Sequence, residues 1–351
     1  MARKARRESI DPTRIQTMHV SSRCVRQCYL CGKDAITGRD FSHRRAWILK
    51  RWRFLASIFG IDTLTMAIMS NHYHLVLRSR PDIVAEWSDE EIAIRWLTMC
   101  PKKRHKDGSP KEPTPNQISE IVNDSERLAE LRRRLSDISW WMKFTNEYIA
   151  RMANREVECR GHFWEGRFEN TEILDEASLL ACAMYVDLNP IRAAMAQTPE
   201  KSEFTGAKSR IDDLRQTPRD SERRERERDL QQSNWLSPIE IKDDDPLGVD
   251  LDPAPYRASL KGFLPISLHK YLSLLDVTGR MIRQDKRGAI PAHLAPIFDR
   301  LGLNQNKWAT LMTSLSRCFK RVIGQPASLQ QEAKRRGQTR LNAPGVHLLT
   351  R

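Results

Sequence analysis

Residues 67–77 read Ala-Ile-Met-Ser-Asn-His-Tyr-His-Leu-Val-Leu, and this stretch places two histidines inside a run of strand-forming residues. Side chains alternate between the two faces of a strand, so His72 and His74 point one way and Tyr73 points the other. Two imidazoles on one face can bind a single metal ion. The alternative is an ordinary strand with two half-buried polar residues, and this stretch alone does not decide between them. Asn71 suits a tight turn from a preceding strand.

A second stretch, at residues 175–190, predicts a helix that carries a tyrosine. Asp175 is a favourable N-cap residue, and the residues after it are mostly alanine, leucine and methionine. Pro190 disfavours helical geometry at Asn189, which is therefore expected to be the last helical residue. Tyr185 and Asn189 are four residues apart, so the helix aims a phenol and an amide at one place. By itself, the stretch also fits an ordinary amphipathic helix with a tyrosine at its boundary.

Three segments in chain order resemble the REP-associated tyrosine transposases, a branch of the single-tyrosine HUH transposases (HUH for His-hydrophobic-His). They are Asn-His-Tyr-His at residues 71–74, His-Phe-Trp-Glu-Gly-Arg-Phe at 162–168, and Tyr-Val-Asp-Leu-Asn-Pro-Ile-Arg-Ala at 185–193. Family members typically show Asn-His-x-His, Phe-Trp-x-x-Arg-Phe/Tyr and Tyr-x-x-x-Asn-Pro. The resemblance covers roughly residues 14–210.

The resemblance implies a transposase-type endonuclease and strand-transferase that acts on single-stranded DNA near hairpins or repeats. Tyr185 is then the nucleophile that forms a 5′-phosphotyrosine bond, and His72, His74 and Asn189 are the metal ligands. The implied cofactor is a divalent metal ion, either Mg2+ or Mn2+, because imidazole ligands shift the preference from magnesium towards manganese. The alternative is a catalytically idle protein that binds DNA hairpins, and the intact set of four residues argues against it.

The predicted elements follow the order β-α-β-β-α-β, which indicates an α+β fold: a ferredoxin-like antiparallel sheet with helices on one face. Strands are expected within residues 15–30, at 61–69, in the histidine stretch and within 163–174. Helices are expected at 43–58, 81–99 and 118–154. This order agrees with the HUH nuclease fold that the resemblance implies, in which the histidine strand is central and the tyrosine helix packs across it.

The chain divides by composition into four parts. A basic arm is expected at residues 1–13, a catalytic domain at 14–210 with a loop or insertion near 101–116, a charged linker at 211–255 and a mainly helical C-terminal region at 256–351. The linker is either an exposed helix or a disordered segment. The last region is either a domain that binds DNA or a partner, or a helical cap on the catalytic domain.

The charge of the chain favours a nucleic-acid partner. It contains 59 Lys and Arg against 45 Asp and Glu, a formal net charge of +14 at pH 7. The residues expected to bind DNA are Arg3, Lys4, Arg6, Arg7, Arg132, Arg133, Arg134 and Arg167, although a solvated helix face explains the three arginines at 132–134 equally well. No membrane span or signal peptide is visible, so a cytoplasmic, nucleoid-associated monomer or homodimer is expected.

Cys24, Cys28 and Cys31 have a spacing that can hold three irons of a [4Fe–4S] cluster. Against a cluster enzyme, no glycine-rich segment follows and no run of alternating strands and helices predicts a barrel. A zinc site with a distant fourth ligand is a further alternative. Reduced thiols are the expectation, because seven cysteines without a signal sequence argue against a disulfide framework.

Overall fold

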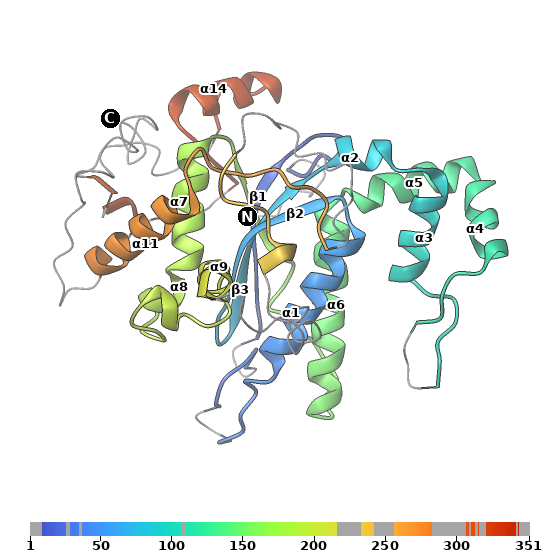
Figure 1. Cartoon of the computed structure of the whole chain (residues 1–351), viewed down its shortest axis with the longest axis horizontal. Helices are drawn as coiled ribbons and strands as arrows, with labels where there is room; N and C mark the ends of the chain where they lie inside the picture. The colour runs from blue at the N-terminus through green and yellow to red at the C-terminus, as the bar shows by residue number, and fades with distance from the viewer. Residues whose placement is uncertain are drawn as a thin grey trace.

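The computed structural model describes residues 9–25, 29–34, 37–106, 110–215, 233–241, 256–282, 307–308, 310–312, 315, 321–341 and 343. Five strands form one sheet in the order β2-β3-β1-β4-β5, and strands β1, β2 and β3 are labelled near the centre of Figure 1. They are β1 (Thr17–Arg23), β2 (Ile61–Ile68), β3 (His72–Ser79), β4 (Glu169–Ile173) and β5 (Val322–Ile323). The first four strands pair antiparallel, and β5 runs parallel to β4, so the sheet is mixed rather than antiparallel throughout. The histidine strand β3 lies between β2 and β1, as predicted.

The helices of the described residues join and follow these strands. They are α1 (Arg44–Ile58), α2 (Pro81–Glu86), α3 (Asp89–Met99), α4 (Pro115–Val122), α5 (Ser125–Leu135), α6 (Ile138–Glu156), α7 (Glu176–Asp187), α8 (Asn189–Arg192), α9 (Gly206–Arg215), α11 (Leu268–Ile282) and α14 (Pro326–Arg335), with 3-10 turns η2 (Pro199–Lys201) and η3 (Ser233–Trp235). The single helix expected at 118–154 is three helices, because the side chains of Asp124 and Asp137 cap α5 and α6. None of the described helices is long and apolar enough to cross a membrane.

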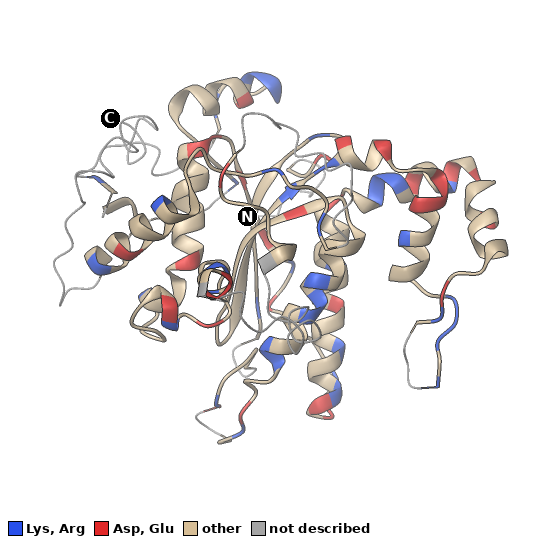
Figure 2. Ribbon diagram, in the orientation of Figure 1, with Lys and Arg blue, Asp and Glu red and all other residues tan. Residues whose placement is uncertain are grey.

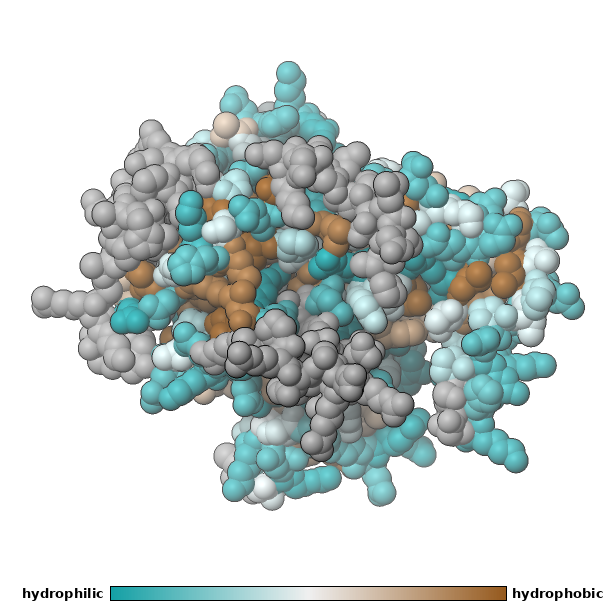
Figure 3. Space-filling model, in the orientation of Figure 1, coloured by the Kyte–Doolittle hydropathy of each residue, from teal (hydrophilic) through white to brown (hydrophobic). Residues whose placement is uncertain are grey.

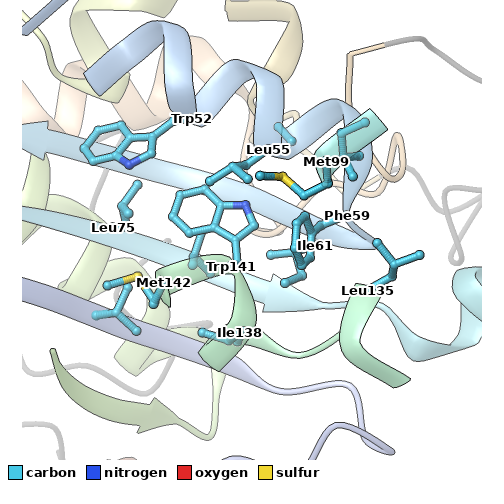
Figure 4. Close-up of a cluster of buried hydrophobic side chains, with 14 of the residues drawn as sticks. Trp52, Leu55, Phe59, Ile61, Leu75, Met99, Leu135, Ile138, Trp141 and Met142 are labelled. Carbon is cyan, nitrogen blue, oxygen red and sulfur yellow. The ribbon is translucent and has the colours of Figure 1, made fainter. Parts of the chain in front are cut away.

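Helices cover both faces of the sheet, so the expectation of helices on one face is wrong. On one face, Leu75 of β3 packs against Trp52 of α1 and Trp141 of α6 (Figure 4). On the other face, Val76 of β3 packs into a second core with Met184 of α7. The physical reason lies in β3 itself, since its consecutive apolar residues bury both sides, as in strands that are covered by helices on each face.

The tyrosine helix α7 is buried all round rather than amphipathic. Every residue from Ala177 to Asp187 is buried. One side of α7 packs on the sheet, and Tyr271, Leu274 and Leu275 of α11 belong to the same core. In the space-filling view, apolar side chains gather over α7 and its neighbours and also where α3 meets α4 (Figure 3). A helix with apolar residues on all sides needs neighbours on all sides.

The described parts of residues 256–351 pack directly on the strands and helices before them. The Tyr271 hydroxyl of α11 donates to Oδ2 of Asp187 in α7 over 2.5 Å. Arg78 of β3 donates to the backbone carbonyls of Lys261 and Gly262. Strand β5 extends the sheet, and Arg336, just after α14, pairs with Glu172 of β4. This region therefore helps to enclose α7.

Candidate active site

The fold brings the two histidines of β3 and the tyrosine of α7 to one place. The ring centroids of His72 and His74 are 4.8 Å apart, and the Tyr185 ring lies nearly perpendicular to the His74 ring at 5.7 Å between centroids. Alternation along β3 puts both histidines on the face that α7 covers. Three residues predicted from two separate motifs thus share one site.

Asn189 also lies at this site, although not as the end of the tyrosine helix. Helix α7 ends at Asp187 with Leu188 as its C-cap, and Asn189 begins the short helix α8. Because the chain stays helical across this junction, Asn189 keeps its place one turn beyond Tyr185. Its side chain is buried and lies beside the Tyr185 hydroxyl.

Two buried polar atoms at the site have no hydrogen-bond partner among the described residues: Nε2 of His74 and Nδ2 of Asn189. Most buried polar atoms in proteins are paired, so two unpaired ones beside the same tyrosine are what a site that binds an ion or a polar group would show. A half-turn of the amide exchanges its nitrogen and oxygen, so Asn189 can present an oxygen there. Together with the His72 imidazole, these groups fit the donor set of a divalent metal ion.

Burial keeps the histidines neutral, which metal ligation requires. Burial, with a smaller effect from Arg23, lowers the pKa of His72 to about 4. Burial and neighbouring histidines hold the pKa of His74 well below its usual value. Within the described chain, no group of three or more His, Cys, Asp or Glu side chains is arranged to hold a metal. The predicted set is of a different kind, since it pairs two histidines with an amide.

A third histidine, His19, lies at the site and was not predicted from the sequence. His19 of β1 lies with Nε2 2.9 Å from Nδ1 of His74, and the two rings stack at 5.1 Å between centroids. Its ring also meets the Tyr185 ring at 6.3 Å. Only the pairing of β1 with β3, where His19 lies opposite Val76, brings it here, and that register is not readable from residues 17–23 alone.

Two arginines flank the tyrosine and were not predicted as site residues. The guanidinium of Arg192, in α8, lies 4.7 Å from the Tyr185 ring centroid, and its Nη1 donates to the Met312 carbonyl. Arg23 is exposed and lies opposite His72 in the β1–β3 pairing, hence on the same face. Burial raises the pKa of Tyr185, and Arg192 and Arg23 both oppose that rise. The tyrosine thus lies in a positively charged surrounding suited to an anionic group.

The Phe-Trp segment braces the back of the histidine strand. Trp164 Nε1 donates to the Asn146 carbonyl over 2.9 Å, and its ring packs edge-on against Tyr73 at 5.7 Å. The Tyr73 hydroxyl in turn donates to Oδ1 of Asn146 over 2.6 Å. This network lies on the face opposite His72 and His74, so the segment supports the site from behind. Arg167 of the same segment is exposed.

The three arginines of α5 predicted to bind DNA contact residues of α2, α3 and α5 rather than this site. Arg3, Lys4, Arg6 and Arg7 lie outside the described residues. In α5, Arg132 pairs with Asp89 and donates to the Val84 and Trp87 carbonyls, while Arg133 and Arg134 both pair with Glu130. Figure 2 shows these basic residues of α5 among acidic ones. Their charges are thus partly satisfied within the protein, and their contact with DNA stays a prediction.

Two of the three clustered cysteines support the turn before His72. The thiol of Cys24 donates to the Asn71 carbonyl over 3.1 Å, and that of Cys31 to the Met69 carbonyl over 2.9 Å. Burial raises the pKa of Cys31, which favours the protonated thiol that such a bond needs. Cys28, the third cysteine of the predicted set, lies outside the described residues.

Comparison with known proteins identifies no relative of this chain. No family model, no curated protein and no solved structure matches it.

Proposed function

We propose that this chain is a transposase-type endonuclease and strand-transferase for single-stranded DNA, acting near hairpins or repeats. One observation carries the proposal: the tyrosine of α7 meets the paired histidines of β3 beside two unpaired buried polar atoms. A nucleophile, a donor set for a cation and flanking arginines are the parts that cleavage of a phosphodiester by a tyrosine needs.

His72, His74 and Asn189 would hold a divalent metal ion, Mg2+ or Mn2+, through two imidazoles and an amide oxygen. Such an ion would polarise a non-bridging phosphate oxygen and stabilise charge on the departing 3′ oxygen. The neutral imidazoles suit this role, since burial disfavours their protonated forms.

Tyr185 supplies the nucleophile. Its oxygen would form a bond to the scissile phosphorus while the bond from phosphorus to the 3′ oxygen breaks, and the phenol proton ends on the released 3′-OH. Because burial raises the pKa of Tyr185, the phenol stays protonated at neutral pH until charge develops. The guanidinium of Arg192, 4.7 Å from the ring centroid, favours that developing negative charge. Arg23, which is exposed on the same face as His72, would bind the phosphate.

The resulting 5′-phosphotyrosine bond conserves the energy of the cleaved phosphodiester. Attack of a 3′-OH on that bond would regenerate Tyr185 and join or transfer the strand without a nucleotide cofactor. The net charge of +14 supports a nucleic-acid partner, because neutralised phosphates release counterions and strengthen binding.

A pool of labelled single-stranded DNA hairpins with random flanks tests the proposal. The pool is incubated with the purified protein and Mn2+ or Mg2+, and DNA that stays attached after denaturation is scored. Adducts are expected for the unchanged protein and for Tyr148→Phe, a matched substitution on the other face of the sheet. They should vanish in Tyr185→Phe and in His72→Ala. Hairpin binding without any adduct would instead identify a DNA-hairpin-binding protein that does not cut.

A further inference from the structure

The hydrogen bond between His19 and His74 restricts which ring nitrogens of these two buried imidazoles carry the protons. Both side chains are almost fully buried, at 4% and 7% exposure, and Nε2 of His19 is 2.9 Å from Nδ1 of His74. A neutral imidazole carries one proton, so only one of the two facing nitrogens can donate. Two arrangements are therefore possible, and they differ in what His74 presents to the active site.

In the first arrangement, His19 donates from Nε2 and His74 carries its own proton on Nε2. That N–H is buried, and among the described residues it has no acceptor. Among the residues that the structure describes, Nε2 of His74 lacks a partner in either arrangement, but a buried N–H without an acceptor is rarer in proteins than a buried acceptor without a donor. In the second arrangement, His74 donates from Nδ1 to His19, and its Nε2 is a lone pair directed at the site. This form lets His74 act as a ligand through Nε2.

We propose that His19 is a positioning residue that accepts a hydrogen bond from Nδ1–H of His74 and thereby keeps the Nε2 lone pair of His74 facing the site. His19 then carries its own proton on Nδ1. The consequence for metal binding rests on the proposed function, whereas the tautomer is a property of the metal-free protein. Partners behind a ligating histidine fix its ring and raise its basicity in the same way.

The geometry behind this role is set by the backbone. His19 lies opposite Val76, and His74 lies opposite Ser21, so the two histidines are diagonal neighbours on one face of paired strands. Their rings are tilted by only 21° to each other, and the Tyr185 ring lies nearly perpendicular to both. Neither ring can turn without disturbing the other contacts.

The direct test is nuclear magnetic resonance of the metal-free protein labelled with 15N in histidine. Long-range proton–nitrogen correlations distinguish the protonated from the unprotonated nitrogen of a neutral imidazole, and a His74→Gln variant assigns the signals. The expected result is a proton on Nδ1 of His74 and none on Nε2. A proton on Nε2 of His74 would overturn the proposal, whether or not the protein cuts DNA.

Metal affinity provides the second test. It is measured from the electron paramagnetic resonance signal of free Mn2+ at equilibrium. His19→Leu removes the acceptor and is expected to weaken Mn2+ binding about 10- to 100-fold. His19→Gln places an amide oxygen near the position of Nε2 and should recover most of that loss. His43→Leu is the control, because His43 pairs with Glu156 away from the site and should leave affinity unchanged.

The outcomes separate this proposal from the proposed function. Equal Mn2+ affinity in His19→Leu and the unchanged protein would refute the positioning role of His19. If the unchanged protein bound no Mn2+, the metal site would fail, and the tautomer of His74 would still decide the role of His19. Should His19→Leu not fold, the tautomer of the unchanged protein and the affinity of His19→Gln decide it.

Discussion

Removal of one buried hydroxyl, in Tyr271→Phe, is expected to destabilise the protein by about 2 kcal/mol. The hydroxyl donates to Oδ2 of Asp187 over 2.5 Å. Oδ1 of the same carboxylate accepts from the Thr65 hydroxyl over 2.7 Å and from the Ala207 amide over 3.0 Å. Asp187 therefore anchors α7 to β2, α9 and α11 at once, two residues after Tyr185.

The magnitude follows from what the substitution leaves behind. Phenylalanine keeps the ring, so no cavity forms, and only the hydrogen bond is lost. Tyr271 and Asp187 are both fully buried, so water does not replace the missing donor. Hydrogen bonds to charged groups contribute about 1.5–3 kcal/mol, and a buried acceptor left unsatisfied costs a similar amount.

Urea unfolding at pH 7, followed by circular dichroism, measures this loss as a shift of the midpoint at constant slope. Tyr29→Phe is the matched control, because the Tyr29 hydroxyl does not contact Asp187. This variant should change the free energy of unfolding by less than about 0.5 kcal/mol. A loss equally small in Tyr271→Phe would refute the view that this hydroxyl anchors α7.

Three further changes have expected outcomes. The pKa of His19 is about 3 in the folded protein and near 6.5 when unfolded, so its contribution to stability is full above pH 6.5 and declines as pH falls from there towards 3. Urea unfolding at pH 7 and pH 5 should show that the free energy of unfolding falls as the pH is lowered, by up to about 1.4 kcal/mol per pH unit from this group. The fall should be smaller in His19→Leu, and an identical pH dependence in both proteins would contradict this contribution of His19. Asp62→Asn leaves the buried guanidiniums of Arg78 and Arg80 without their shared carboxylate and should cost about 3–5 kcal/mol, whereas an unchanged melting temperature would show that Asp62 is dispensable. Arg192→Gln should slow formation of the DNA adduct by about 100-fold with little change in hairpin affinity, and an equal loss of binding and cutting would assign Arg192 to DNA binding alone.

The sequence predicts those parts of the site that depend on local periodicity. Alternation along a strand puts His72 and His74 on one face, and helical spacing puts Asn189 one turn beyond Tyr185. Both relations hold within a few residues of chain, so they survive whatever surrounds them. Likewise, β3 carries its own evidence of a buried strand, and it lies inside the sheet.

The parts that sequence reasoning missed depend on residues far apart in the chain. His19 becomes a site residue only because the register of β1 on β3 sets it diagonal to His74. The burial of α7 on every side depends on Tyr271 and the rest of α11, which follow it much later in the chain. The second helical layer forms because Leu75 faces Trp52 and Trp141 while Val76 faces α7. Local sequence patterns indicate which residues are apolar, but not which distant helices or strands will pack on them.

Mapping the attachment point of cleaved DNA tests the central claim most directly. Trypsin cleavage after Arg167 and Arg192 releases a peptide whose only tyrosine is Tyr185. After incubation with hairpin DNA and Mn2+, nuclease trimming and mass spectrometry, this peptide is expected to carry a nucleotide mass on Tyr185. A nucleotide on Tyr73, on Tyr148 or on any other residue would contradict the assignment of Tyr185 as the nucleophile.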